Sequence, residues 1–180
     1  VRLVLDECFV QFLTSGEEAS MQLETGRFRY LFVLQAFTKI YAVPGIRLGY
    51  GISSDKALLE RMETVRQPWS VSTPAQAAGL SALKEDHREE QTRQLVKSER
   101  ERMEKELENL RIEYIPSEAN FLLFNSEINW FEELKKRGIL IRDCANYRGL
   151  GNGWYRMAVR LPEENDRLLE CMKQVLNERS

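Results

Sequence analysis

The chain has 180 residues, of which 43% are hydrophobic and 30% charged, and its formal net charge is −2 at pH 7. This size suits one globular domain, or one and a half, with a sizeable core. The near balance of acids and bases excludes the basic surface that nucleic-acid-binding proteins carry. The apolar runs have the length of strands, far short of the roughly 20 residues of a membrane span. We therefore expect no nucleic-acid or membrane partner.

The cysteine and histidine content argues against a metal site. Three widely spaced cysteines, Cys8, Cys144 and Cys171, accompany a single histidine, His87, and no CxxC pair occurs. Structural zinc sites use four cysteine or histidine ligands at short, regular spacings, so a metal site built from these residues is not expected. Reduced thiols in the cytoplasm are the simpler interpretation.

The first half of the chain predicts a buried sheet followed by helices. Apolar runs at 1–5, 30–34 and 46–52 are typical of strands covered on both faces, as in parallel sheets. Residues 14–28 are polar and predict a loop with a helical turn. Helical spacing of apolar residues begins at Asp55, after the candidate caps Ser53 and Ser54, and a capping box at Thr73 opens a second helix. The chain begins without methionine inside an expected strand, so we expect it to be a piece of a longer protein.

The second half predicts a different architecture. Residues 87–109 are highly charged with a thin apolar stripe, which indicates a long solvated helix linking two parts. Strands are expected at 119–124, 139–144 and 154–160, with helices at 129–137 and near the C-terminus. We expect an α+β layer with one helix on either side of the sheet. The predicted division is 1–87 and 88–180.

Two ionisable residues follow predicted strands. Asp6 ends the first strand and Lys39 lies shortly after the second, so both can face one crevice at the carboxyl edge of the sheet. The alternative is that Asp6 caps a turn and Lys39 extends to water. The spacing alone gives the two interpretations equal weight.

The segment around Lys39 decides between them. The string Ala36-Phe37-Thr38-Lys39, followed by PGIRLGY with Arg47 and preceded by VLDECF, resembles fold-type I pyridoxal phosphate enzymes, the aspartate aminotransferase superfamily. The resemblance implies an α/β fold. A three-layer αβα large-domain portion with a mostly parallel sheet would cover 1–87, and a small α+β C-terminal domain would cover 88–180.

The resemblance also implies roles for these residues. Lys39 would form a Schiff base with pyridoxal 5'-phosphate, and Asp6 would keep the pyridine nitrogen protonated. Arg47 and Thr38 would hold the cofactor phosphate. Two positions depart from the common pattern. Ala36 stands where many members have a phosphate-binding serine, and Phe9 stands where many aminotransferases have a tyrosine that hydrogen-bonds the ring hydroxyl.

The C-terminal half resembles one subfamily more closely. The string ILIRDCANYRGLGNGWYRMAVR is similar to the threonine-phosphate decarboxylases of cobalamin biosynthesis, close relatives of histidinol-phosphate aminotransferase. The resemblance implies that Arg142 and Arg156 hold a substrate with two anionic ends, Arg156 at the α-carboxylate and Arg142 nearer the phosphate. Without this resemblance, the favoured interpretation, by about two to one, would be that both are surface arginines.

These observations predict a cytoplasmic lyase fragment that decarboxylates L-threonine O-3-phosphate to aminopropanol phosphate. One alternative is a class I/II aminotransferase acting on histidinol phosphate or a related amino acid. Another is a non-catalytic fragment, because the resemblance places the glycine-rich phosphate loop and the ring-stacking residue upstream of this chain. We expect a homodimer of the full-length parent, and we expect this chain to be inactive alone.

Overall fold

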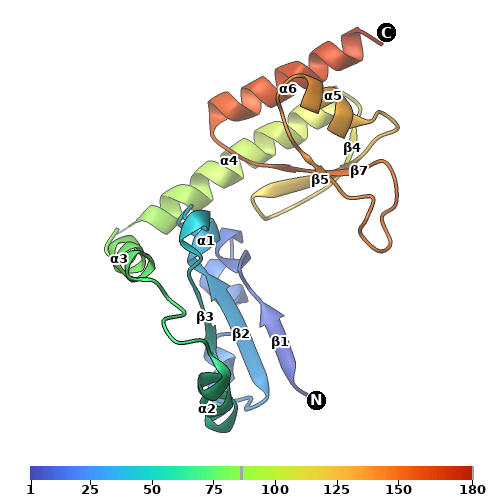
Figure 1. The fold of residues 1–180 in the computed structure, drawn as a ribbon. Coiled ribbons are helices and arrows are strands. Elements are labelled where there is room, and N and C mark those ends of the chain that lie inside the picture. Colours follow the sequence, from blue (N-terminus) through green and yellow to red (C-terminus); the bar gives the residue numbers. More distant parts are fainter. Residues whose placement is uncertain (86, 180) are drawn as a thin grey trace. The chain divides into compact units, whose positions relative to one another are not determined.

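The computed structural model describes residues 1–85 and 87–179, which form two compact units, Val1–Arg93 and Gln94–Ser180 (Figure 1). Residues 86 and 180, which fall inside the predicted domains, lie outside the described residues. The predicted functional division at 87/88 stays a prediction. In the described part of the chain, no helix combines the length and apolarity needed to cross a membrane.

The first unit contains a three-stranded sheet in the order β1-β2-β3. Strand β1 (Leu3–Asp6) runs parallel to β2 (Leu31–Ala36), and β3 (Gly49–Ile52) runs antiparallel to β2. The strand predicted at 46–52 begins later than expected, because Pro44–Ile46 forms a 3-10 turn and Arg47 adopts a left-handed conformation with φ 57°.

Short helical elements surround this sheet. They are η1 (Val10–Phe12), η2 (Gly16–Ala19), η3 (Leu23–Gly26), α1 (Phe37–Ile40), η4 (Pro44–Ile46), α2 (Lys56–Val65) and α3 (Thr73–Ala82). The predicted helical turn within 14–28 is thus present as 3-10 turns. Asp55 caps α2 by accepting from the Leu58 amide, and Ser72 caps α3 by accepting from the Ala75 amide. Both caps lie one or two residues from those predicted.

The second unit has an antiparallel sheet in the order β4-β5-β7-β6. Its strands are β4 (Glu113–Ile115), β5 (Phe121–Asn125), β6 (Arg142–Asp143) and β7 (Trp154–Ala158). Its helices are α5 (Trp130–Lys136) and α6 (Pro162–Asn177), together with α4 (Arg88–Asn109), which runs across the boundary between the units.

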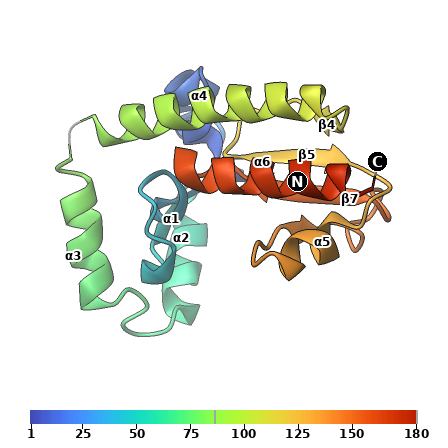
Figure 2. The ribbon, with the colours of Figure 1, turned by 90° about the horizontal axis from the view of Figure 1, so that it is seen from above.

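The helices of the second unit cover one face of its sheet (Figures 1 and 2). Leu122 pairs with Met157, and Phe124 pairs with Tyr155; these four side chains are buried and share one face. The alternate strand residues remain half-buried or exposed. The expectation of a helix on either side was therefore wrong. The pattern of alternate burial leaves an open face on this sheet.

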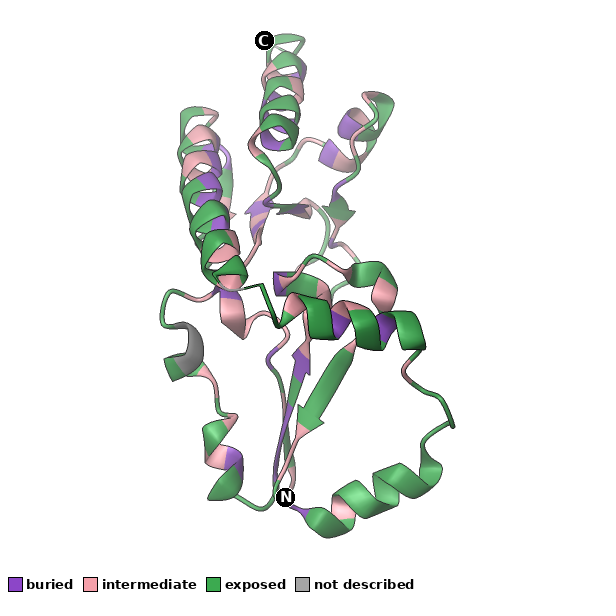
Figure 3. Cartoon of the chain, turned by 90° about the vertical axis from the view of Figure 1, so that its left-hand side faces the viewer, coloured by how far each residue is buried: buried purple, intermediate pink, exposed green. Residues whose placement is uncertain are grey.

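Burial differs between the two units (Figure 3). Most of the large side chains that are fully buried belong to the second unit, and they include Trp130, Phe124, Met103 and Leu107. In the first unit, α2 is exposed or half-exposed along nearly all of its length. On β1, Leu3 is 54% exposed and Val4 is 55% exposed. The second unit therefore has the more complete core.

A buried asparagine organises one edge of that core. Asn165 is 1% exposed, and its Nδ2 donates to the Glu99 carboxylate at 2.7 Å and to the Arg160 carbonyl oxygen at 2.9 Å. Its Oδ1 accepts from the Arg160 amide at 3.0 Å. Arg102 also donates to Glu99, at 2.7 Å. The network thus links α4, the end of β7 and α6.

Replacing Asn165 with alanine should destabilise the chain by about 1–3 kcal/mol, because buried polar groups at Glu99 and Arg160 lose their partners. Urea denaturation measures the change in the free energy of unfolding. Asn109→Ala is the matched control, since Asn109 is an exposed asparagine that donates to Glu106. Equal midpoints for the two variants would contradict this role of Asn165.

Candidate active site

A buried carboxylate joins the ends of the two parallel strands. Glu7 is 8% exposed and follows β1 directly. It accepts from the Ser20 hydroxyl at 2.6 Å, the Met21 amide at 2.8 Å and Gln35 Nε2 at 3.0 Å. The Glu7 amide donates to the Leu34 carbonyl oxygen. Residues just before Glu7 and just after Gln35 are therefore held at the same edge of the sheet.

Sequence reasoning missed Glu7. From the sequence, a carboxylate beside Asp6 at a strand end is expected to be solvated. The three groups that donate to Glu7 come from separate parts of the chain. The only local signal is a glutamine inside an otherwise apolar strand, at Gln35. A polar residue on a buried strand needs a partner, and that partner is Glu7.

Asp6 lies at this edge, within reach of the charge of Lys39. Asp6 Oδ1 accepts from the Cys8 amide at 3.0 Å. Hydrogen bonds from Cys8 hold the pKa of Asp6 below its ordinary value, and the positive charge of Lys39 acts in the same direction. The Lys39 ammonium nitrogen also lies 5.3 Å from the centroid of the Phe9 ring. The charge of Lys39 therefore acts on Asp6 at this edge, and their sharing of one cofactor site stays a prediction.

Lys39 is exposed although its neighbour is buried. It lies on α1, whose next residue, Ile40, is 1% exposed. One turn of helix places the apolar side chain inward and the amine outward. Thr38, on the same turn, is half-buried. Its role at a cofactor phosphate stays a prediction.

Arg47 occupies a strained backbone position. Its φ of 57° lies in the left-handed region, which costs a residue with a side chain about 1–2 kcal/mol. Its Nη1 donates to the Pro44 carbonyl oxygen at 3.4 Å, so this contact ties the exposed guanidinium to its own turn. Strained residues cluster at functional sites. The meeting of Arg47 and Lys39 at one phosphate stays a prediction.

Arg142 and Arg156 are direct partners across β6 and β7, which confirms their predicted placement on neighbouring strands. Directly opposed residues of an antiparallel pair share a face, so both lie on the open face of the sheet. Arg142 donates to Asn146 Oδ1 at 2.9 Å and lies 5.4 Å from the Tyr147 ring. Arg156 lies 5.0 Å from the Phe121 ring.

The two arginines act on one thiol. Burial raises the pKa of Cys144, while the charges of Arg156 and Arg142 lower it. The positive field of both guanidinium groups is thus felt at the same point of the second unit. Two adjacent cations with aromatic neighbours suit an anionic ligand.

The family model described as "Aminotransferase class I and II" matches residues 1–171. The chain belongs to the class I and II aminotransferase family. Members of this family use pyridoxal phosphate, so the predicted superfamily and cofactor are confirmed at the level of the family. The α/β architecture is confirmed as well.

Two named activities occur among the relatives of this aminotransferase-family chain. Threonine-phosphate decarboxylase from Salmonella typhimurium is 37% identical over 98% of the chain and 49% of its own length. Histidinol-phosphate aminotransferase 1 from Archaeoglobus fulgidus is 37% identical over 97% of the chain and 52% of its own length. The chain therefore spans about half the length of the curated relatives that it matches.

A solved structure shows the same fold. The histidinol-phosphate aminotransferase from Clostridium acetobutylicum superposes with a TM-score of 0.92 at 31% identity. The match covers 98% of this aminotransferase-family chain and 55% of the solved chain. The relation is thus one of fold as well as sequence.

The Cys8 thiol lies near enough to Asp6 and Lys39 to report on both charges. Burial and the neighbouring Asp6 raise the pKa of Cys8 to about 11, and Lys39 opposes the shift. Since the thiolate is the reactive form, Asp6→Asn should speed alkylation of Cys8 and Lys39→Met should slow it. Iodoacetamide labelling followed by mass spectrometry measures both rates, with Cys171 as an internal reference. Changes of the same sign in the two variants would contradict the geometry.

Proposed function

We propose that the complete protein is a pyridoxal phosphate enzyme that decarboxylates L-threonine O-3-phosphate to aminopropanol phosphate. The observation that carries the proposal is the exposed Lys39 amine, which lies beside the Phe9 ring and near enough to Asp6 for its charge to lower the pKa of that carboxyl, in a chain of this family. The similarity to the Salmonella decarboxylase supports the choice of reaction.

The residues present fit the cofactor. An accessible primary amine at Lys39 suits a bond to an aldehyde, and a carboxylate that stays ionised at Asp6 suits a pyridinium nitrogen. When bound, the cofactor supplies a ring that accepts the electron pair left when a bond to the substrate α-carbon breaks. Asp6 would hold the proton on the ring nitrogen. Thr38 and Arg47 would bind the phosphate.

Lys39 would have a second task as a proton carrier. Its amine would return a proton to the substrate carbon after the carboxylate has left. Phe9 lies against the amine without a hydroxyl of its own. It therefore offers an apolar wall where tyrosine would offer a hydrogen bond.

The arginine pair would bind the substrate. An amino-acid phosphate ester carries two anionic ends, and Arg142 and Arg156 supply two adjacent cations. We assign the α-carboxylate to Arg156 and the phosphate to Arg142. Guanidinium groups bind both anions with paired hydrogen bonds.

One alternative is transamination of histidinol phosphate or a related amino acid. The similarity to the Archaeoglobus aminotransferase supports transamination as much as the similarity to the Salmonella decarboxylase supports decarboxylation. Both reactions would use the same residues of this chain. They differ in the bond that breaks, so product analysis for carbon dioxide or a keto acid separates them.

The second alternative is that this chain by itself only folds or associates. The half-length match and the exposed apolar strand residues of the first unit support it. We infer that further polypeptide covers this sheet in the complete protein and that catalysis needs it. We also infer a homodimeric parent in the cytoplasm, with 1–87 serving the cofactor and 88–180 the substrate.

Lys39→Ala in the complete protein should lower turnover by roughly 10²–10⁴-fold or more, because both the cofactor bond and the proton carrier are lost. Steady-state release of carbon dioxide from L-threonine O-3-phosphate measures this. Lys56→Ala, at an exposed lysine that begins α2, is the control. Borohydride treatment of the wild type should leave a pyridoxyl group on Lys39. Near-normal turnover of Lys39→Ala would refute the assignment.

Substitution of the two arginines should affect the binding of different substrates. A charge-assisted hydrogen bond contributes about 1.5–3 kcal/mol, or roughly ten- to a hundredfold in affinity. Arg156→Ala should weaken binding of every α-carboxylate substrate, whereas Arg142→Ala should weaken L-threonine O-3-phosphate more than L-threonine. Arg148→Ala, at an exposed arginine of the same segment, should change neither. Equal losses for both substrates in Arg142→Ala would rule out its phosphate role.

A further inference from the structure

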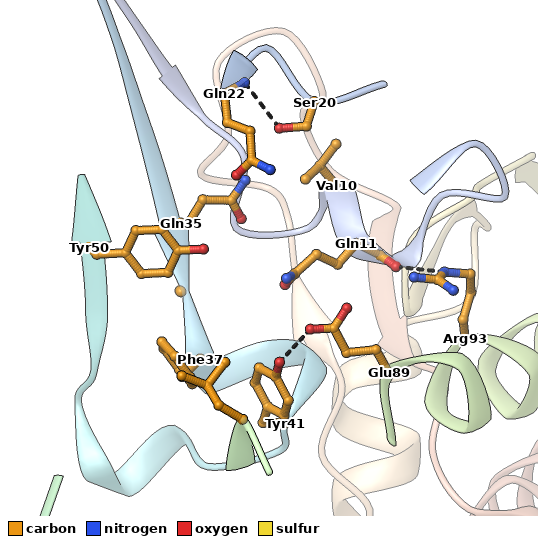
Figure 4. A pocket seen from close by; sticks show the side chains of 12 residues that line it. Val10, Gln11, Ser20, Gln22, Gln35, Phe37, Tyr41, Tyr50, Glu89 and Arg93 are labelled. Carbon is orange, nitrogen blue, oxygen red and sulfur yellow. Dashed lines mark hydrogen bonds between the residues drawn. The ribbon is translucent and has the colours of Figure 1, made fainter. Parts of the chain in front are cut away.

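A cavity of about 200 Å³ lies in the first unit (Figure 4). Its walls come from β2, β3, α1, the end of α3, the segment 10–22 and the first turns of α4. Every residue that lines it belongs to the unit Val1–Arg93. Since a water molecule occupies about 30 Å³, the cavity has room for roughly six water-sized groups.

Two amide oxygens at this cavity have no hydrogen-bond partner among the described residues, Gln35 Oε1 and Gln11 Oε1. The orientation of Gln35 is determined, because its Nε2 donates to the Glu7 carboxylate, which can only accept. Gln35 is 5% exposed. Figure 4 shows the side-chain ends of Gln11, Gln35 and Tyr50 turned toward the same space. A buried acceptor without a donor is unfavourable until a donor reaches it.

The cavity wall carries one carboxylate, Glu89, and one guanidinium, Arg93. Glu89 lines the cavity and accepts a hydrogen bond from the Tyr41 hydroxyl. Arg93 is the cation on the wall, but its Nε donates to the Gln11 carbonyl oxygen at 3.0 Å and its Nη1 pairs with Glu90. The Arg93 guanidinium thus already has partners, whereas Glu89 and the two amide oxygens are available to a donor. An anion there would meet Glu89 directly.

We propose that this cavity binds a small organic cation with several N–H donors, a guanidinium or ammonium compound. The N–H groups satisfy the oxygens of Gln11 and Gln35, and the charge pairs with Glu89. The proposal goes beyond the proposed reaction and uses neither Asp6 nor Lys39. Because α4 carries Glu89 and continues across the boundary between the units, the bound cation contacts the helix that joins them.

Calorimetric titration of the complete protein with methylguanidinium chloride tests the site. Methylguanidinium is chosen because, unlike a primary amine, it does not condense with an aldehyde. Glu89→Gln should weaken binding by roughly tenfold or more. Glu60→Gln is the matched control in the same unit, since Glu60 is exposed on α2 and is not among the residues that line the cavity, and it should bind as the wild type does. N-methylurea, the neutral analogue of the same shape, should bind far more weakly than the cation.

Gln11→Leu provides a second variant if Glu89→Gln fails to fold. It removes one free amide oxygen and keeps the backbone carbonyl that accepts from Arg93. Its affinity for methylguanidinium should fall by a few-fold or more. No saturable binding to the wild type, equal affinity for N-methylurea, or equal losses in Glu89→Gln and Glu60→Gln would each overturn the proposal. A soaked crystal that shows only ordered water in the cavity would do the same.

Discussion

The buried carboxylate of Glu7 holds the first unit together at the sheet edge that carries the candidate site residues. Removing a carboxylate from water is costly, and hydrogen bonds to several donors offset that cost. The donors here come from the loop at Ser20 and Met21 and from strand β2 at Gln35. One interaction therefore positions Asp6 on one side and the turn that bears Lys39 on the other. The same hydrogen bond determines which end of the Gln35 amide faces the cavity.

The second unit depends on a different constraint, the burial of one face of its sheet. Because strand side chains alternate, burying Leu122, Phe124 and Tyr155 under the helices leaves Arg156 on the other face. The register then places Arg142 opposite Arg156. A slip of one residue would move one arginine into the core, where an unpaired charge is strongly unfavourable. The core of this unit thus specifies the position of its cationic pair.

The sequence allowed some of this to be predicted and concealed the rest for physical reasons. Periodicity and capping residues predicted the helices at 55–65 and 73–83, and motif resemblance singled out Lys39 and Asp6. Arg142 and Arg156 could be placed on neighbouring strands from their apolar context.

Glu7 could not be predicted, since its partners lie up to 28 residues away. The strand at 46–52 was drawn too long because a left-handed Arg47 leaves no trace in an apolar pattern. The single covered face of the second sheet was missed because alternation shows that a strand is half-buried without showing which helices cover it.

The exposure of Lys39 bears on what the complete protein must add. Water stabilises the ammonium form of lysine, whereas a lysine that attacks an aldehyde is partly desolvated. In this chain Lys39 is exposed at the same sheet edge where Leu34 is 37% exposed. Apolar surface of this kind is buried when further polypeptide packs on it, and each Å² removed from water contributes about 25 cal/mol. The packing that stabilises this unit would also withdraw water from the amine. Under the proposed function, the stability of the first sheet and the reactivity of Lys39 would therefore depend on the same packing.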